Sequence, residues 1–154
     1  MIGWLVFSAC AARSPLIVGP PVQTTDLFLL HAFDRDLAGT AVVSVDDDGW
    51  ALLGLGPTGT AWFTVRSVDG EVSVTAPDDR MADVLRRIPL DRDLPLLYRY
   101  SCEDRCRADG GILSVDGEQA RWRGRGGPAT IVRTEDRAVL TDPRRGYHLT
   151  VLTR

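Results

Sequence analysis

The sequence contains no lysine and no asparagine, and its 154 residues include only two histidines and three cysteines. All 18 basic residues are therefore arginines, a bias that we attribute to a GC-rich genome rather than to chemistry. The formal net charge of −3 argues against a dedicated nucleic-acid-binding protein, because such proteins carry a basic excess. Hydrophobic residues make up 44% and charged residues 25%, which is typical of a globular domain.

Motifs of the common enzyme classes are also missing. The sequence has no nucleophile elbow, phosphate-binding loop, zinc-binding helix or dinucleotide fingerprint. His31 and His148 lie in apolar or alternating segments, where we interpret them as half-exposed sheet residues. Acidic residues gather at Asp46–Asp48 and Asp78–Asp79, which is typical of turns and helix caps. We therefore expect no catalytic residue, no metal ligand and no cofactor, and the chain is not predicted to be an enzyme.

One arginine cluster surrounds a tryptophan. Arg121, Arg123 and Arg125 lie around Trp122, which is compatible with an anion-binding or nucleic-acid-binding patch. Strand alternation places Arg121 and Arg123 on the same face, and a solvated sheet face explains this equally simply. We favour the solvated face, and no nucleic-acid partner is predicted.

The longest apolar run lies at the N-terminus, from Met1 to Ala12, and is interrupted only by Gly3 and Ser8. It is shorter than the roughly 20 residues of a membrane-spanning helix, but it suits the apolar region of a signal peptide. The segment Phe7-Ser-Ala-Cys10 resembles a bacterial lipobox. We predict a signal-peptide remnant over residues 1–9, lipid attachment at Cys10, and a proline-containing tether over residues 10–22. The alternative is a frayed or docked N-terminus with an ordinary cysteine.

The other two cysteines are close in sequence. If Cys10 is acylated, Cys102 and Cys106 remain as a pair, which can close a small disulfide loop in an oxidising periplasm. The alternatives are two free thiols or a metal site. A metal site needs further ligands, and the only histidines are distant in sequence.

The body of the chain has the pattern of short strands separated by turns. Strands are expected over residues 24–33, 39–46, 50–55, 60–67, 71–75, 112–115, 119–123, 129–134, 137–141 and 147–153. A short amphipathic helix is expected at about residues 79–88, and residues 90–109 form either a helical turn or a lid-like loop. The sequence thus predicts a mainly β fold, a single curved antiparallel sheet or open half-barrel of about 9–10 strands, with one short helix in a lid.

One part of this sheet is apolar on both faces. The stretch Trp50–Leu55 does not alternate, and Trp62 interrupts the polar side of its strand. Since a strand that is apolar on both faces must be covered, we expect either a filled core or a cavity. The candidate cavity lining is Trp50, Leu52, Leu53, Trp62 and Phe63.

Two stretches resemble a known family. The stretch Gly49–Val65 and the ending Leu140–Val151 are similar to outer-membrane lipoproteins related to LolB, including a LolB-like family of unassigned function. The resemblance implies an unclosed antiparallel barrel over residues 23–154, with a helical lid around an apolar cavity. LolB itself receives lipoproteins from a periplasmic carrier and inserts them in the outer membrane. Ala11, which follows the lipobox cysteine, implies sorting to the outer membrane.

The expected function combines these observations. We expect a monomeric, periplasm-facing protein, anchored by lipid in the bacterial outer membrane. It binds a lipid or the acyl chain of a lipidated partner in its half-barrel, for lipid or lipoprotein localisation or transfer. The alternative is a structural or assembly lipoprotein with a filled core and no ligand.

Overall fold

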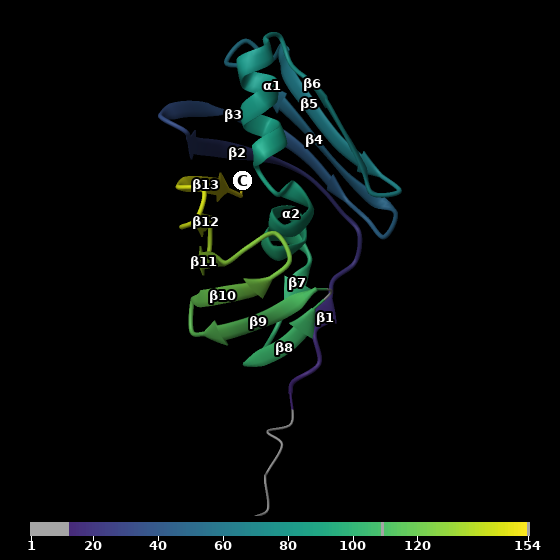
Figure 1. Cartoon of the computed structure of the whole chain (residues 1–154), viewed down its shortest axis with the longest axis vertical. Coiled ribbons are helices and arrows are strands. Elements are labelled where there is room, and N and C mark those ends of the chain that lie inside the picture. Colours follow the sequence, from purple (N-terminus) through teal and green to yellow (C-terminus); the bar gives the residue numbers. More distant parts are fainter. Residues whose placement is uncertain (1–12, 109, 154) are drawn as a thin grey trace, which may run out of the picture.

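Alternating apolar and polar residues place most of the chain in one antiparallel sheet. A computed structural model describes residues 13–108 and 110–153, and its main sheet has eleven strands in the order β6-β5-β4-β3-β2-β13-β12-β11-β10-β9-β8 (Figure 1). The strands are β2 (Val22–Ala32), β3 (Arg35–Val45), β4 (Gly49–Leu55), β5 (Ala61–Val68), β6 (Glu71–Thr75), β8 (Arg105–Ala108), β9 (Gly111–Asp116), β10 (Gln119–Gly124), β11 (Ala129–Arg133), β12 (Arg137–Asp142) and β13 (Tyr147–Leu152).

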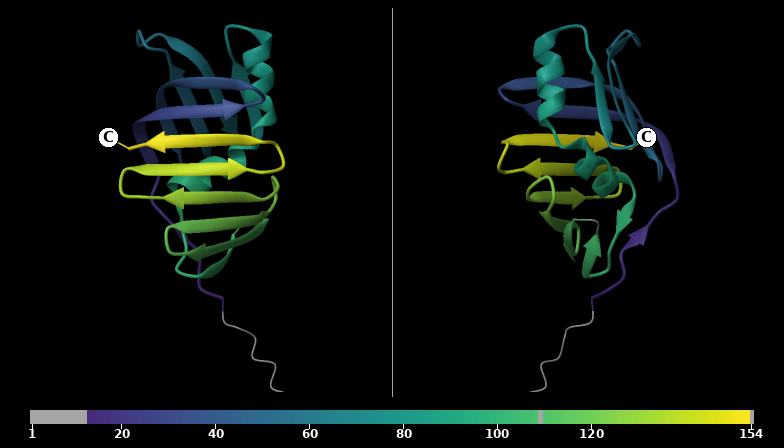
Figure 2. Two further views of the ribbon diagram at one scale, coloured as in Figure 1. Left: turned by 90° about the vertical axis from the view of Figure 1, so that its left-hand side faces the viewer. Right: turned by 45° about the vertical axis from the view of Figure 1, so that its right-hand side comes forward.

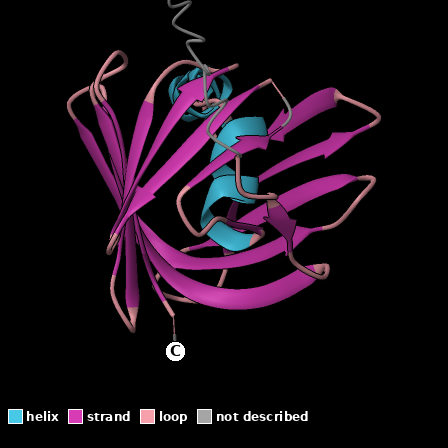
Figure 3. Cartoon of the chain, turned by 90° about the horizontal axis from the view of Figure 1, so that it is seen from below, coloured by secondary structure: helices cyan, strands magenta, loops and turns pink. Residues whose placement is uncertain are grey.

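The sheet is strongly curved and stays open, as the sequence predicts. Figures 2 and 3 show that it bends around two helices, and that its edge strands β6 and β8 are not paired with each other. The register shifts between Gly54 and Leu55, a local irregularity that helps a strand to bend. At Gly54 the ring of Phe63 packs directly against the backbone, and a Cβ atom there would lie 2.3 Å from Phe63 Cε1.

The prediction of nine or ten strands in the sheet is too low by one edge strand. The four-residue strand β8 is too short to give a periodic signal, and it contains Cys106. Two further short strands, β1 (Ile17–Val18) and β7 (Tyr100–Ser101), pair with each other in a separate two-stranded sheet.

The predicted amphipathic helix is confirmed as α1 (Asp79–Arg87). The Asp78 carboxylate caps it by accepting a hydrogen bond of 2.8 Å from the Met81 backbone N–H. Its buried residues face the sheet, and Arg86 and Arg87 occupy the last turn, where positive charge is favourable. The helix ends before Pro89.

The expectation of a single helix is wrong, because residues Leu90–Tyr98 form a second helix, α2. Two features hide it in the sequence. Pro95 lies inside the helix, and the charged side chains of Arg92 and Asp93 are buried, which disturbs the amphipathic pattern. Tertiary contacts therefore decide this element rather than local propensity.

The core lies between the concave face of the sheet and the two helices (Figure 3). Its sheet side includes Phe28, Leu30, Val43, Phe63, Val65, Ile131, Leu140, Leu149 and Val151. Its helix side includes Leu85, Ile88, Leu90, Leu94 and Leu97. Among the described residues, neither helix is long and apolar enough to cross a bilayer.

The described part of the predicted tether, residues 13–21, lies against the domain. Ser14 forms an isolated bridge with Cys106, β1 pairs with β7, and the Gly19 backbone N–H donates to the Arg99 carbonyl at 2.9 Å. The prolines of this segment limit regular structure to the two residues of β1. The predicted signal-peptide remnant and the lipid attachment residue Cys10 lie outside the described residues.

Candidate functional site

A cavity of about 490 Å³ lies on the open side of the sheet. The ends of β3, β4 and β5 form one wall, α2 forms the second, and β10 with its following loop forms the third. The lining includes Val45, Asp46–Asp48, Gly49, Trp50, Ser67, Gly70, Pro89, Asp91, Arg92, Pro95, Leu96, Tyr100, Trp122, Arg125 and Gly126. The open side of the sheet thus borders this cavity.

Two tryptophans give this cavity apolar walls with satisfied polar groups. Trp50 is buried, and its Nε1–H donates to Asp91 Oδ1 at 2.6 Å. Trp122 is buried in the opposite wall, and its Nε1–H donates to the Arg125 carbonyl at 3.0 Å. Because both indole N–H groups already have partners, these two side chains have only ring carbons left to contact a ligand, and both are largely buried.

The rim of the cavity is acidic. Asp46 accepts hydrogen bonds from the backbone N–H groups of Asp48 and Gly49, which holds the β3–β4 turn. Arg99 Nη2 reaches Asp47 Oδ1 at 3.0 Å across the rim. The cavity therefore combines two tryptophans with charged and polar side chains, a mixed lining that can contact an amphipathic ligand.

A second, much smaller space lies between the helices and the sheet. It holds about 30 Å³, close to the volume of one water molecule. Apart from Tyr98, its lining is entirely apolar: Phe28, Leu30, Ala41, Val43, Leu52, Phe63, Leu85, Ile88, Leu90, Leu94, Leu97, Leu149 and Val151. Helix α2 separates the two spaces, since Leu94 and Leu97 face this one while Pro95 and Leu96 face the larger cavity.

A buried charged network fixes α2. The Arg92 guanidinium donates to Asp93 Oδ1 at 2.7 Å, to the Tyr147 hydroxyl at 2.8 Å and to Asp142 Oδ2 at 3.0 Å. It also donates to the carbonyls of Gly126, Gly127 and Pro128. The Tyr147 hydroxyl in turn donates to Asp93 Oδ2, so Arg92 and Asp93 are both satisfied although their side chains are almost fully buried.

The pKa shifts in this network have separable causes. Burial raises the pKa of Asp93 above its ordinary value, although the Arg92 guanidinium opposes this effect. Burial acts in the same direction on Asp142, but the Arg145 backbone N–H and the Arg92 guanidinium outweigh it and lower the Asp142 pKa. Burial and the Asp93 carboxylate together raise the pKa of Tyr147, so its hydroxyl remains a donor at neutral pH.

The C-terminal end of α2 is held by two further contacts. Arg133 Nη1 donates to the Leu97 carbonyl at 2.9 Å, and Arg133 Nη2 donates to the Leu96 carbonyl, which satisfies two terminal acceptors of the helix. The Tyr98 hydroxyl donates to Asp26 Oδ2 at 3.0 Å, and Asp26 is a buried carboxylate on the concave face of β2. Polar contacts thus hold both ends of the helix that divides the two spaces.

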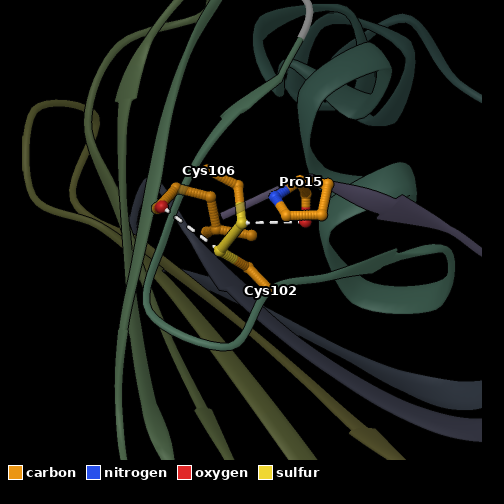
Figure 4. Close-up of a disulfide and its surroundings, with 4 residues drawn as sticks. Pro15, Cys102 and Cys106 are labelled. Carbon is orange, nitrogen blue, oxygen red and sulfur yellow. Dashed lines mark hydrogen bonds between the residues drawn. A yellow bond between two sulfur atoms is a disulfide. The ribbon is translucent and has the colours of Figure 1, made fainter. Parts of the chain in front are cut away.

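A disulfide follows α2 directly. Cys102 and Cys106 are bonded, and the Cys106 sulfur lies 3.4 Å from the Pro15 carbonyl (Figure 4). A bonded sulfur carries no proton, so we interpret this approach as a packing contact. The disulfide loop therefore connects the end of α2, strand β8 and the N-terminal segment.

The structure distributes the five predicted cavity residues over three places. Trp50 lines the large cavity, whereas Leu52 and Phe63 line the small apolar space. Leu53 lies on the opposite face of β4 from Leu52, and Trp62, which stands where the β4–β5 register is irregular, is half-buried against the core and lines neither space. These five residues therefore do not line a single cavity.

Other residues of the site were not predicted from the sequence. The sequence shows Trp122 only as the centre of an arginine cluster, and it does not predict the network of Arg92 and Asp93. The one signal for this network is the run of alternating charges Asp91-Arg92-Asp93 inside the otherwise apolar stretch Ile88–Leu97. His31 and His148 are half-exposed or exposed on the convex face, with ring centroids 6.2 Å apart.

The described residues contain no group of three or more histidine, cysteine or acidic side chains placed to hold a metal ion. No protein-family model matches the sequence, and no curated protein matches it significantly.

Proposed function

We propose that this protein is a lipid-anchored component of the bacterial envelope that binds a lipid, or the acyl chain of a lipidated partner, at the open side of its half-barrel. One observation carries the proposal. A cavity of about 490 Å³, lined by two tryptophans and by charged side chains, lies beside an interior space that is apolar apart from Tyr98, and α2 separates them.

The size and lining of the cavity support this proposal. Sites for small ligands usually measure roughly 300–1,000 Å³ and combine apolar walls with a few polar groups. Here Trp50, Trp122 and Leu96 supply apolar surface for a chain, while Arg125 in the lining can contact a polar headgroup. Each methylene group that leaves water contributes about 0.8 kcal/mol to binding.

The small interior space limits how a long chain is accommodated. With α2 in place it holds only about 30 Å³, so a chain that passes beyond the large cavity must displace α2 from the sheet. Displacement uncovers the apolar concave face, including Leu52 and Phe63, and a bound chain covers this face again. Binding and release then require no chemical step, only a difference in affinity between donor and acceptor.

A structural or assembly lipoprotein with a filled core is the second candidate. The same space of about 30 Å³ favours it, because such a core has no room for a ligand unless α2 moves. The two candidates differ in whether the folded protein takes up an acyl chain.

Quenching of tryptophan emission by palmitate brominated on its chain tests the proposal. The full chain carries Cys10→Ala, to prevent acylation, and Trp4→Phe. Three variants then keep only Trp50, only Trp122 or only Trp62, with phenylalanine at the other positions, and circular dichroism checks their folding. We expect saturable quenching of Trp50 and Trp122, while Trp62, which lines neither space, serves as the matched control and is spared.

Native mass spectrometry of the Cys10→Ala chain gives a second measurement that needs no tryptophan substitution. We expect one palmitate to be bound per chain. Folded protein without bound palmitate, or quenching confined to Trp62, would contradict the cavity and favour the filled core.

Incorporation of labelled palmitate during expression in a Gram-negative host tests the anchor. We expect the label on the chain and the chain in the outer-membrane fraction. Cys10→Ala should abolish both, whereas the control Cys102→Ala/Cys106→Ala should retain the label. A label that survives Cys10→Ala would refute the assignment of the attachment site.

A further inference from the structure

The convex face of strands β8–β10 carries four arginines. Cross-strand pairing places Arg105 opposite Ser114 and Ser114 opposite Arg121. The next row places Arg107 opposite Ile112 and Ile112 opposite Arg123. We call Arg105, Arg107, Arg121 and Arg123 the arginine face.

The arginine face is exposed and, among the described residues, forms no ion pair. All four side chains are exposed, and among the described residues none of them forms an ion pair. Within the described part of the chain, the one side-chain hydrogen bond from this set runs from Arg121 Nη2 to Gln119 Oε1, at 3.4 Å. Like charges on neighbouring strands repel, so this arrangement does not stabilise the sheet.

A hollow lies within the arginine face. It measures about 280 Å³ and is lined by Arg105, Ile112, Ser114, Arg121 and Arg123. Guanidinium groups from β8 and β10 thus surround a space floored by the Ser114 and Ile112 side chains of β9. Planar guanidinium groups bind phosphate oxygens in a bidentate manner, and a serine hydroxyl adds a further donor. The hollow therefore has the chemistry of a phosphate-binding depression, although the whole chain has a net charge of −3.

The arginine face lies where the N-terminal segment joins the domain. Ser14 bridges to Cys106, which stands between Arg105 and Arg107 on β8. Figure 1 shows the N-terminal segment passing beside β8 at this end of the molecule. A lipid anchor four residues before Ser14, at Cys10, would hold this edge of the sheet next to a membrane.

Exposed apolar side chains continue the same convex surface. Val132 on β11, Leu152 on β13 and Leu29 on β2 are 40%, 39% and 47% exposed. Alternation places all three on the face that carries Arg121 and Arg123. Val132 lies on the strand next to β10, whereas Leu152 and Leu29 lie three and four strands away. A basic cluster with a neighbouring apolar side chain is suited to a membrane surface.

We propose that the arginine face docks on an anionic lipid membrane, and that the hollow accepts the phosphate of a lipid headgroup. The lipid anchor of the proposed function would bring the arginine face close to the membrane, but this inference rests on the four arginines and the hollow between them. Docking would orient the domain on its membrane with the convex side of β8–β10 towards the lipid.

Vesicle co-sedimentation of the full chain carrying Cys10→Ala tests this proposal without the anchor. The vesicles contain equal parts of phosphatidylcholine and phosphatidylglycerol, and vesicles of phosphatidylcholine alone serve as the neutral control. We expect binding to the anionic vesicles only, and this binding should weaken as salt is added. Arg121→Gln/Arg123→Gln should weaken it about 25-fold, or about five-fold for each arginine near the surface.

The matched control is Arg80→Gln/Arg86→Gln, which makes the same change of charge on exposed arginines of α1. Equal weakening by both double variants would overturn the proposal, because binding would then follow net charge alone. Equal binding to neutral vesicles would also overturn it. So would binding of inorganic phosphate, or of an RNA, at these arginines without binding to the vesicles.

The palmitate measurement separates this inference from the proposed function. Arg121→Gln/Arg123→Gln should leave palmitate quenching of Trp50 unchanged, because the substitutions lie on the opposite face of the sheet. Loss of vesicle binding with palmitate uptake retained supports the arginine face. Vesicle binding without any palmitate uptake would contradict the proposed cavity alone.

Discussion

Replacement of Arg92 by methionine should destabilise the protein far more than replacement of an exposed arginine. Arg92 is a buried cation whose guanidinium contacts two carboxylates, one hydroxyl and three carbonyls. Methionine fills much of the same space but leaves Asp93 without its cation. Removal of one partner of a buried ion pair costs about 3–5 kcal/mol of unfolding free energy.

The structure points to the lower end of this range, about 3 kcal/mol. Asp142 keeps Arg145, whose Nη1 lies 3.1 Å from its Oδ2, and it also keeps two backbone N–H donors. Asp93 keeps the hydrogen bond from Tyr147. The cost therefore arises mainly from the uncompensated charge of Asp93 and from the three carbonyls of residues 126–128.

The unfolding free energy that Arg92→Met loses should depend on pH, and the Asp93 pKa sets the direction of this dependence. Burial already raises the pKa of Asp93, and loss of Arg92 raises it further. A carboxyl group whose folded-state pKa is raised costs stability while it is charged, and this cost falls as the pH drops through that pKa. The difference between the wild-type protein and Arg92→Met should therefore narrow as the pH is lowered from 7 towards the Asp93 pKa.

Urea unfolding followed by circular dichroism measures these free energies. The matched control is Arg86→Met, because Arg86 pairs only with Asp83 at the surface, at 3.5 Å, and such pairs contribute about 0–1 kcal/mol. The double variant Arg92→Met/Asp93→Asn should be less destabilised than the sum of the single variants. Two results would refute this prediction: Arg92→Met loses no more unfolding free energy than Arg86→Met, or the losses of Arg92→Met and Asp93→Asn simply add in the double variant.

Three further predictions concern the sheet, the disulfide and acid stability. Gly54→Ala should lower the unfolding free energy, measured in urea, by about 1–3 kcal/mol, because the added Cβ meets the buried Phe63 ring. Phe63→Leu in the same chain should relieve part of this cost. If the costs of the two substitutions simply add, there is no clash between these side chains. Cys102→Ala/Cys106→Ala should lower the unfolding free energy by at most about 2 kcal/mol, since the disulfide loop is short. It should also speed proteolysis at residues 13–21, and an unchanged cleavage rate would disprove the role of the disulfide in holding this segment. The lowered pKa of Asp142 stabilises the fold above its unfolded-state value of 3.8, and this contribution is lost as the pH falls through the folded-state pKa. The acid-unfolding slope in this range should therefore be shallower in Asp142→Asn than in the wild-type protein, and identical slopes would exclude Asp142 as the cause.

The elements that the sequence predicts well are those whose signal is local. Alternation over β5 and β13, and the Asp78 cap with apolar residues at helical spacing in α1, depend on neighbouring residues alone. For α2 the sequence predicts only a helical turn or a lid-like loop, and it does not predict strand β8, because the conformation of both segments depends on distant partners. Arg92 is buried only because Tyr147, Asp142 and the loop at residues 126–128 surround it.

The residues of the candidate site were also only partly predictable from the sequence. Trp50 could be predicted as a cavity residue because its apolar stretch does not alternate, but Trp122 comes from a strand 72 positions later in the chain. The open edge of the curved sheet brings the two tryptophans to opposite walls of one cavity. The pattern of residues within either strand does not predict that the two tryptophans line the same cavity, because their proximity depends on how far the whole sheet bends.

By itself, the sequence determined the strand-rich character of this protein, the turns between its strands and one amphipathic helix, because hydrophobic periodicity and caps act over a few residues. Only the tertiary structure decided that Arg92 and Asp93 are buried, that α2 divides two spaces, and that arginines from β8 and β10 meet on one face. Each of these outcomes is a contact between segments distant in the chain, and such contacts arise only when the whole sheet has curved around its helices.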